Sequence, residues 1–376
     1  MMITNGSEQN NAIAILGMHR SGTSTLARSL NLLGVYLGED KDLVPPYPEN
    51  PEGFWERLDV INLQERLLAT LQRSWDTGMP LPDRWQDASE VQPFKGELAA
   101  LIKQNFQGVT LWGWKDPRST LLIDLWKDVL AEIDVELSAV FVVRNPLDVA
   151  RSLQKRNGFP CDKGFGIWFN YNITALRAII TVPTVFISYD KFLANWEPEL
   201  RHCASSLNIA WPQNDTDLKV SMNSFIRPDL RHSCSVTEDL QKTGAPQPVL
   251  ALYELFLGLL DGKVRIDGIS EVINDLYNDF FAYSRFYQHD TAATYDPGRQ
   301  LITTKKQLEE YDFLLGQINR QLAERNCQVG ELKSSSGVAE AQLTELQQRL
   351  QDLLNSRSWK ITKLFRKMHG FIKKKE

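Results

Sequence analysis

The stretch from Ala12 to Leu26, AIAILGMHRSGTSTL, places the strongest constraint on how this chain can fold. It begins with a short apolar run bounded by glycine, which is typical of a buried parallel strand. Gly17 and Gly22 follow, with hydroxyl residues around Arg20, and an apolar helical pattern begins at Leu26. Such a turn receives free backbone N–H groups and the positive end of a helix dipole. The stretch therefore predicts an oxyanion-binding site.

The spacing of Gly17 and Gly22 matches the GxxxxGK[ST] loop of proteins that bind nucleoside triphosphates. Thr23, however, stands where that motif has a lysine. Because the lysine neutralises the β- and γ-phosphates, its replacement argues against a kinase or an ATPase. An apolar strand ending at Asp116 nevertheless imitates a magnesium-binding carboxylate, so a nucleotide kinase with a variant loop stays an alternative.

Apolar runs alternate with helical patterns over the first two hundred residues, which predicts an α/β domain with a mostly parallel central sheet. We expect later strands to end at Lys115, at Val143 and at Ile187. Charged residues at the carboxyl ends of parallel strands face the ligand crevice, and Lys115, Asp116 and Arg144 stand at such ends. Asp116 could instead cap the following helix.

A second group of anion-binding side chains follows the strand that ends at Val143. Arg144 comes first, and Ser152 and Arg156, four residues apart in the next helical pattern, share one helix face. The three side chains can therefore converge on a single phosphate. The alternative is a structural ion pair between Arg144 and Asp148.

These two stretches resemble the two phosphate-binding loops of sulfotransferases. Gly17 to Ser24 has the form GxxRSGT[ST] of the 5′-phosphosulfate loop, and RNPLDVARS has the form RNPxDxxxS of the 3′-phosphate signature. The arginine and serine of that signature fall on Arg144 and Ser152. In the tyrosylprotein branch a further arginine contacts the 3′-phosphate, and Arg156 falls on it. Tyr189 resembles the tyrosine of the YE-x-L element, which contacts the adenine end.

The resemblance implies a P-loop-like, three-layer domain that transfers a sulfuryl group from 3′-phosphoadenosine 5′-phosphosulfate to a hydroxyl acceptor, with no metal. Arg20 would hold the 5′-phosphate and the migrating sulfonate, and Lys115 would donate to the bridging region, as the KDP lysine does in the tyrosylprotein branch. The donor-binding residues that it implies are Gly17, Arg20, Ser21, Gly22, Thr23, Ser24, Arg144, Ser152, Arg156 and Tyr189.

The general base is the least defined group. The tyrosylprotein branch uses a glutamate beyond the loop arginine, and Glu39 and Asp40 occupy that window without a clear match. We favour Glu56, in NPEGFWE, because that segment would lie near the crevice if it folds back over it. His19 and Asp116 are the other candidates, and each of these groups could be structural.

Composition excludes some classes of function. A formal net charge of −5 argues against general nucleic-acid binding. The four cysteines are scattered, with no metal-binding spacing, which favours reduced thiols in a cytoplasmic protein. We find neither a signal peptide nor a run long enough to span a membrane.

The C-terminal third has a different character. An uninterrupted apolar heptad pattern over 301–355 predicts a long coiled coil and hence a homodimer, with a helix folded back on the domain as the alternative. We expect a disordered N-terminus at 1–11, the sulfotransferase domain at 12–290 and a linker at 291–300. A non-catalytic scaffold with a degenerate domain is a further alternative, against which the intact Arg20, Arg144 and Ser152 count.

The segment 356–376 combines many lysines and arginines with apolar residues at helical spacing. Such a basic amphipathic tail predicts attachment at the inner face of an anionic membrane, although a solvated run of charge has the same composition. The sequence from Ser356 to Thr362 also resembles the SxSWRxTxPLR tails of bacterial surface-polysaccharide enzymes, departing from them where Leu364 and Phe365 replace Pro-Leu. This resemblance favours a glycan acceptor.

Overall fold

The computed structural model describes residues 10–46, 53–226 and 235–291, together with part of the segment 325–356. The chain divides into two units, Met1–Tyr295 and Asp296–Glu376. The predicted N-terminal tail up to residue 9, most of the heptad segment and nearly all of the basic tail lie outside the described residues.

A four-stranded parallel sheet forms the centre of the first unit, which confirms the predicted α/β class. Its strands are β1 (Asn11–Leu16), β2 (Leu111–Lys115), β3 (Glu136–Val143) and β4 (Thr184–Ser188), in the spatial order β2-β1-β3-β4. The first strand begins one residue earlier than expected, because Asn11 already pairs with both neighbouring strands. Since β1 is central, its carboxyl end delivers the glycine-rich loop to the middle of one sheet edge.

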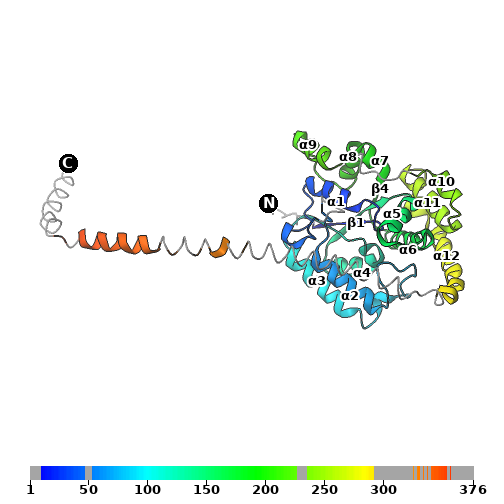
Figure 1. Ribbon diagram of the computed structural model, residues 1–376, viewed down its shortest axis with the longest axis horizontal. Helices are drawn as coiled ribbons and strands as arrows, with labels where there is room; N and C mark the ends of the chain where they lie inside the picture. The colour runs from blue at the N-terminus through cyan, green and yellow to red at the C-terminus, as the bar shows by residue number, and fades with distance from the viewer. Residues whose placement is uncertain are drawn as a thin grey trace, which may run out of the picture. The chain divides into compact units, whose positions relative to one another are not determined.

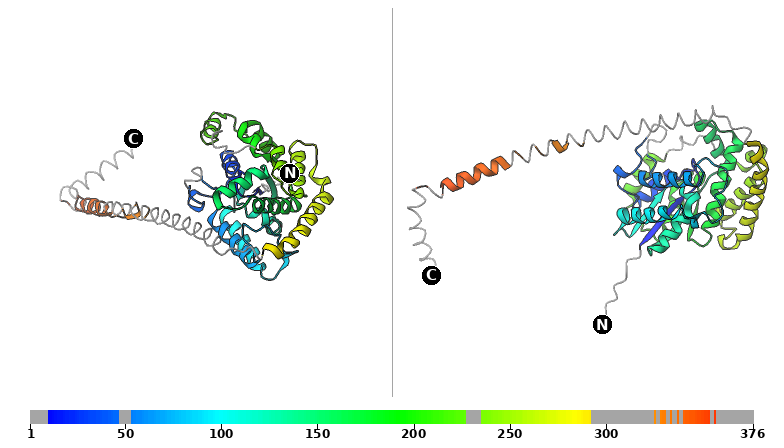
Figure 2. Two further views of the ribbon diagram at one scale, coloured as in Figure 1. Left: turned by 45° about the vertical axis from the view of Figure 1, so that its right-hand side comes forward. Right: turned by 90° about the horizontal axis from the view of Figure 1, so that it is seen from below.

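Helices cover both faces of this sheet, so the unit has three layers (Figure 1). Its helices are α1 (Thr23–Leu32), α2 (Leu58–Thr70), α3 (Gln92–Phe106), α4 (Ser119–Glu132), α5 (Pro146–Asn157), α6 (Cys161–Ala178), α7 (Tyr189–Ala194), α8 (Trp196–Ser206), α9 (Thr216–Phe225), α10 (Thr237–Lys242), α11 (Gln247–Leu260) and α12 (Ser270–Thr291). Figure 2 shows α11 and α12 together at one side of the unit.

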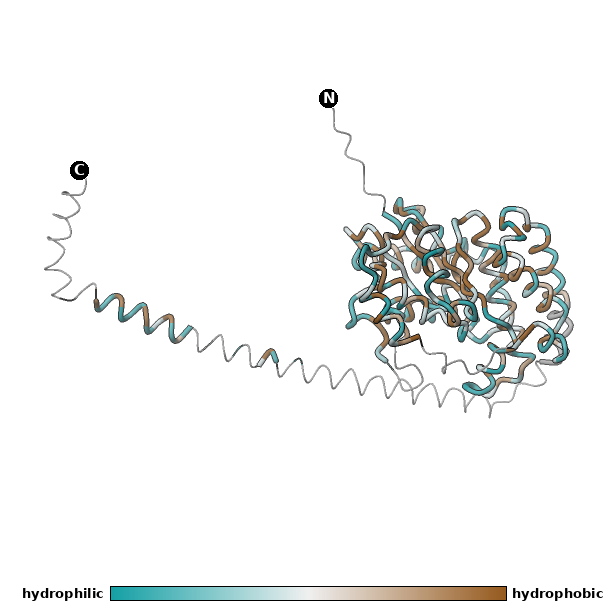
Figure 3. The backbone as a smooth tube through the Cα atoms, turned by 90° about the horizontal axis from the view of Figure 1, so that it is seen from above, coloured by the Kyte–Doolittle hydropathy of each residue, from teal (hydrophilic) through white to brown (hydrophobic). Residues whose placement is uncertain are grey.

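The alternation of side chains along β1 explains the two apolar cores. Ala12, Ala14 and Leu16 face a large core shared with α2 to α6 and α10 to α12, whereas Ile13 and Ile15 face a smaller core with α1 and α7 to α9. Successive residues of a strand point to opposite faces, so a strand buried on both faces is apolar throughout. Hydrophobic segments are accordingly concentrated inside the unit (Figure 3).

Stacked aromatic rings fix the edge strand β2. Trp112 stacks on Phe106 with ring centroids 4.1 Å apart, and Trp114 stacks on Trp126 at 4.0 Å. All four rings are almost completely buried. This packing holds the end of β2, and therefore Lys115, in a defined position.

In the second unit the structure describes a helix over 340–353. Its seam leucines, at the positions predicted for the heptad, are 59 to 64% exposed, and Figure 3 shows apolar residues recurring along this helix. The coiled coil itself therefore stays a prediction. Within the described part of the chain, no helix combines the length and the apolar character needed to cross a membrane.

Candidate functional site

The glycine-rich loop between β1 and α1 is shaped by contacts at both of its ends. The Gly17 N–H donates to the hydroxyl of Thr120, 3.0 Å away, and that hydroxyl lies 3.1 Å from the Gly17 carbonyl, to which it donates. Gly17, Arg20 and Gly22 all have positive φ, at 144°, 68° and 92°. Since an L-residue adopts such angles at a cost, the surrounding contacts hold Arg20 in a set conformation.

The N-terminus of α1 opens onto this loop. Gly22 caps the helix, and the Leu26 N–H is the first to donate to a carbonyl one turn back, that of Gly22, at 3.3 Å. The preceding N–H groups, of Thr23 to Thr25, have no acceptor within a helix that starts there. Thr23, which replaces the lysine of nucleotide-binding loops, is buried, and a Cβ on Gly17 would lie 2.9 Å from its methyl carbon.

The two predicted phosphate-binding stretches meet in space. Arg20 Nε donates to the hydroxyl of Ser152 at 2.8 Å, and Arg144 Nη1 donates to the Arg20 carbonyl at 2.6 Å. Residues from the loop, from the end of β3 and from α5 therefore form one site at the carboxyl edge of the sheet. The Asn145 side chain accepts the Leu147 N–H at 2.9 Å and so caps α5, which carries Ser152.

Tyr189 closes one side of this site. Its ring lies so close to Gly22 that a Cβ there would be 2.0 Å from the ring carbon Cδ2. The Arg144 guanidinium lies 4.7 Å from the centre of the same ring. Arg144 Nε is buried and has no hydrogen-bond partner among the described residues, so this guanidinium retains a donor for an anion.

Arg156 lies on α5, one turn after Ser152, as its spacing in the sequence predicted. Its guanidinium lies 5.9 Å from the centre of the Trp75 ring, whereas that of Arg144 lies over Tyr189. The hydroxyl of Ser152 accepts a hydrogen bond from Arg20. A role for Arg156 at the 3′-phosphate stays a prediction.

Lys115 connects the end of β2 with the loop and with the segment before α2. Its Nζ donates to Ser24 Oγ and to the Phe54 carbonyl, each at 3.1 Å, and forms an ion pair with Glu56. Lys115 is 4% exposed and Glu56 9%. The segment that contains Glu56 therefore does fold back to the crevice, and the structure places the favoured base next to the favoured cation.

Asp116 is held by other protein groups. It is completely buried and accepts hydrogen bonds from Gln64 Nε2 at 2.9 Å, from the Arg118 N–H at 2.9 Å and from Arg118 Nη1 at 2.8 Å. A carboxylate with three donors on its oxygens is a poor ligand for magnesium and a poor proton acceptor. Asp116 therefore positions the start of α4. No cluster of three or more His, Cys, Asp or Glu side chains suited to a metal ion occurs in the described ranges.

His19 lies on the inner side of the loop. Its ring centroid is 4.8 Å from that of Trp75 and 5.8 Å from that of Tyr171. Burial is the main cause that holds the pKa of His19 well below its usual value, and nearby arginine and lysine charges act in the same direction. Its Nε2 is buried without a hydrogen-bond partner among the described residues.

Sequence reasoning missed two residues that shape this site, Thr120 and Trp75. Thr120 follows the charged end of β2, where a hydroxyl in the first helical turn was a usable signal. Trp75 lies in a connection rich in tryptophan and proline, in which no pattern distinguishes a core ring from one that covers a loop.

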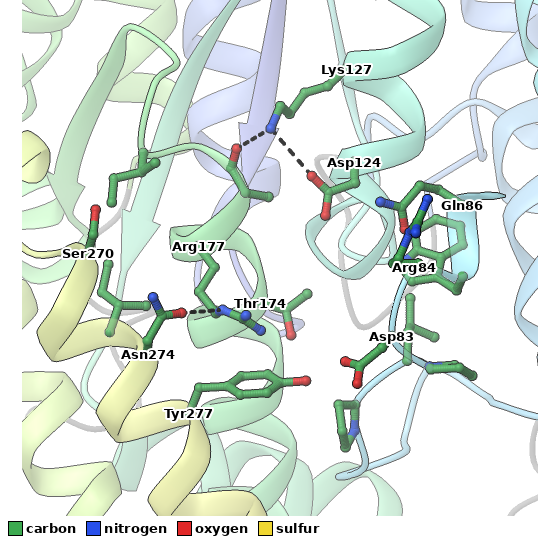
Figure 4. A pocket seen from close by; sticks show the side chains of 17 residues that line it. Asp83, Arg84, Gln86, Asp124, Lys127, Thr174, Arg177, Ser270, Asn274 and Tyr277 are labelled. Carbon is green, nitrogen blue, oxygen red and sulfur yellow. Dashed lines mark hydrogen bonds and ion pairs between the residues drawn. The ribbon is translucent and has the colours of Figure 1, made fainter.

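A separate cavity of about 530 Å³ lies between the segment 80–86 and helices α4, α6 and α12. Arg177 extends over the ring of Tyr277, 3.8 Å from its centre, and Tyr277 points toward Asp83 (Figure 4). None of the residues predicted for the site lines this cavity.

No protein-family model matches the chain, and no curated protein matches it. Among solved structures it is similar to the sulfotransferase domain of the Synechococcus PCC 7002 olefin synthase, at 19% identity and a TM-score of 0.41, over 68% of this chain and 98% of that one. It is also similar to sulfotransferase STF1 from Mycobacterium tuberculosis H37Rv, at 13% identity and a TM-score of 0.36, over 66% and 77%. It is similar as well to a sulfotransferase domain from the curacin biosynthetic pathway, at 19% identity and a TM-score of 0.33, over 55% of this chain and 77% of that one. Similarities with such low identities and TM-scores support no statement about function. Any functional proposal therefore rests on the residues of the site.

Proposed function

We propose that this chain is a sulfotransferase that uses 3′-phosphoadenosine 5′-phosphosulfate as its donor. The observation that carries the proposal is the contact of Arg20 with Ser152 and of Arg144 with the Arg20 backbone. These contacts join the loop that resembles a 5′-phosphosulfate site to the helix that resembles a 3′-phosphate site. A ligand with phosphates at both ends of one ribose fits such a pair of adjacent anion sites.

The chemistry of the site fits an anionic donor in three respects. The N-terminus of α1 offers backbone N–H groups at the loop. Arg144 Nε is buried without a hydrogen-bond partner among the described residues. The Tyr189 ring lies beside Gly22 and next to the Arg144 guanidinium, which supports its assignment to the adenine end. The donor supplies an activated sulfuryl group, and its leaving group is a phosphate.

Cations can take the place of a metal in this reaction, because charge develops on a phosphate oxygen as the S–O bond breaks. We assign Lys115, fixed by the hydroxyl of Ser24, to the bridging region, and Arg20 with the α1 N-terminus to the 5′-phosphate and sulfonate. Glu56 would take the proton of the acceptor hydroxyl as the new O–S bond forms. The ion pair of Glu56 with Lys115 supports this assignment, because it holds the two side chains next to each other.

We further propose a glycan hydroxyl as the acceptor and the cytoplasmic face of the membrane as the place of reaction. Both proposals rest on the sequence of the basic tail alone. The test is transfer of labelled sulfate to a lipid-linked glycan compared with a tyrosine peptide, and transfer to the peptide alone would contradict the acceptor assignment.

The decisive experiment for the donor is calorimetry with adenosine 3′,5′-bisphosphate and with ATP. We expect the bisphosphate to bind more tightly, and the Ser152→Ala variant to weaken it while Ser206→Ala, at the end of α8, leaves it unchanged. Sulfuryl transfer should persist in excess chelator. Preference for ATP, with activity lost on chelation and restored by magnesium, would establish the nucleotide kinase instead.

A further inference from the structure

The imidazole of His19 is an unused polar group in the wall of the proposed donor site. It precedes Arg20 in the loop and is only 9% exposed, packed between the rings of Trp75 and Tyr171. Its Nε2 is buried with no hydrogen-bond partner in the described part of the chain. Burying a polar atom without a hydrogen bond is unfavourable, so such an atom marks a place that a ligand could complete.

Four elements bring positive charge toward this imidazole. Burial is the largest cause that holds the pKa of His19 well below its usual value, and neighbouring cations lower it further. These cations are Arg118 at the start of α4, Arg156 on α5, Lys115 at the end of β2 and Arg20 in the loop. The other titratable groups of the surrounding elements each have a partner or pack on the imidazole. They are Tyr171 on α6, Asp76 beside Trp75, which pairs with Lys163, Glu56, which pairs with Lys115, and Asp116 and Glu65, which pair with Arg118.

Each phosphate of the bisphosphate brings a charge of about −1.5 to −2 at pH 7. An opposite charge within about 4–6 Å shifts a pKa by 1–3 units toward the charged form.

We propose that His19 takes up a proton when the donor's phosphates bind, so that the imidazolium donates a hydrogen bond to the bound anion, and releases it when the site empties. The proton comes from solvent, and no other bond changes. The site then contains the additional positive charge of the imidazolium only while the ligand is bound. In the empty site the imidazole is neutral and adds no fifth positive charge to those of Arg20, Lys115, Arg118 and Arg156. Glu56 stays available for the acceptor's proton. The inference rests on the proposed function, because it requires the bisphosphate as ligand.

Nuclear magnetic resonance tests this directly, because the chain has only five histidines. We would label the imidazole carbon Cε1 in the full-length protein, assign His19 with the His19→Gln variant, and titrate with and without adenosine 3′,5′-bisphosphate. We expect the His19 signal to stay neutral below pH 6 in the free protein, and its midpoint to rise by at least one pH unit with the ligand. His202, exposed on α8, is the internal control and should not move.

Calorimetry as a function of pH gives an independent readout. A rise of one unit in the pKa makes binding up to tenfold tighter as the pH falls through that range. His19→Gln should flatten this dependence relative to the wild type, and His202→Gln should retain it. Titration of the phosphates is common to all three proteins and cancels in the comparison.

Each outcome decides the inference. An unchanged His19 midpoint, or a pH dependence of affinity that persists in His19→Gln, would overturn proton uptake at this residue. If His19→Gln does not fold, variants of the other four histidines assign the His19 signal by elimination, and its midpoint in the wild type still decides the question. Failure of the wild type to bind the bisphosphate at all contradicts the proposed function, whereas binding without a shift at His19 contradicts this inference alone.

Discussion

Arg20 Nε and the hydroxyl of Ser152 lie 2.8 Å apart although 132 residues separate them in the sequence. The contact joins the loop after β1 to the first turns of α5. Because β1 and β3 are neighbours in the sheet, loops at their carboxyl ends necessarily lie side by side. Arg144, at the end of β3, adds a second bond to the same loop. Changes at any of these residues should therefore affect one site.

The first prediction concerns Arg144. We expect Arg144→Ala to weaken binding of adenosine 3′,5′-bisphosphate by about 2–4 kcal/mol, the scale of a charged hydrogen bond to a buried anion. Adenosine 5′-phosphosulfate, which lacks the 3′-phosphate, should respond much less. Calorimetry with both ligands measures the difference, and Arg201→Ala, on the exposed surface of α8, is the matched control. Equal losses for the two ligands would remove Arg144 from the 3′-phosphate.

The second prediction concerns the ion pair of Lys115 and Glu56. Removing one partner of a buried pair leaves an uncompensated charge, which costs about 3–5 kcal/mol. We expect Lys115→Met to lower the free energy of unfolding by that amount, and the double variant Lys115→Met with Glu56→Gln to recover much of it. Denaturant unfolding measures both. Arg265→Ala, which removes an exposed pair with Asp267, should leave the midpoint unchanged. A double variant no more stable than the single one would show that the pair is not coupled.

The third prediction concerns Gly22. Its φ of 92° and the Tyr189 ring 2.0 Å from an added Cβ leave no room for a side chain. Gly22→Ala should therefore displace Tyr189 and abolish bisphosphate binding. Gly96→Ala, on the exposed face of α3 with open space around its Cα, should instead stabilise the fold by about 0.5–1 kcal/mol through helix propensity. Retained binding in Gly22→Ala would show that Tyr189 is free to move aside.

The fourth prediction concerns stability against pH. Because the pKa of His19 is lower in the folded than in the unfolded chain, the unfolded state binds more protons in this range. The free energy of unfolding should then fall as the pH drops below about 6.5, the ordinary pKa of histidine. Unfolding of the wild type and of His19→Gln between pH 8 and 5 measures the contribution. Parallel curves for the two proteins would contradict the shift.

Much of this fold could be predicted from the sequence, because apolar runs bounded by glycine identify buried strands wherever they occur. The strand ending at Leu16 has this form, and the runs ending at Lys115 and Val143 are likewise short and apolar and stop at a charged residue. Each strand ends in the loop or charge that forms the site. The meeting of Arg20 with Ser152 could not be predicted, since the helical spacing of Ser152 and Arg156 favoured a common ligand for those two residues. The spacing of residues along a helix shows which of them share a face, but it does not show which side chain from a distant part of the sequence contacts that face.

The sequence also could not predict which of the buried polar side chains have hydrogen-bond or ion-pair partners. Asp116 was one of three candidate bases, and only the contacts with Gln64 and Arg118 show that its oxygens have donors. His19 and Glu56 differ in the same way: Glu56 has a cationic partner, whereas Nε2 of His19 has none among the described residues. Such differences depend on neighbouring side chains from several helices and strands, so no periodic pattern in the sequence predicts them.

The last prediction concerns the helix over 340–353. Its seam leucines, 59 to 64% exposed, are Leu343, Leu346, Leu350 and Leu353. Burying one leucine side chain stabilises by about 1.5–3 kcal/mol, and an isolated helix of this length is marginal in water. We expect the exposed seam to pair with a second copy of the chain as a parallel homodimer, because an identical copy offers the same seam in register.

Light scattering on three full-length proteins tests the pairing. The wild type should be a dimer at micromolar concentration, and the variant Leu346→Lys with Leu350→Lys a monomer, because two charges cannot be buried in the seam. The control, Gln348→Lys with Gln351→Lys, adds the same charge on the opposite face of the helix and should stay dimeric. Bisphosphate binding should be the same in all three, since the donor site lies entirely within the first unit. A monomeric wild type would refute self-pairing, and a control that dissociates as readily as the leucine variant would show that added charge, and not the lost seam, separates the chains.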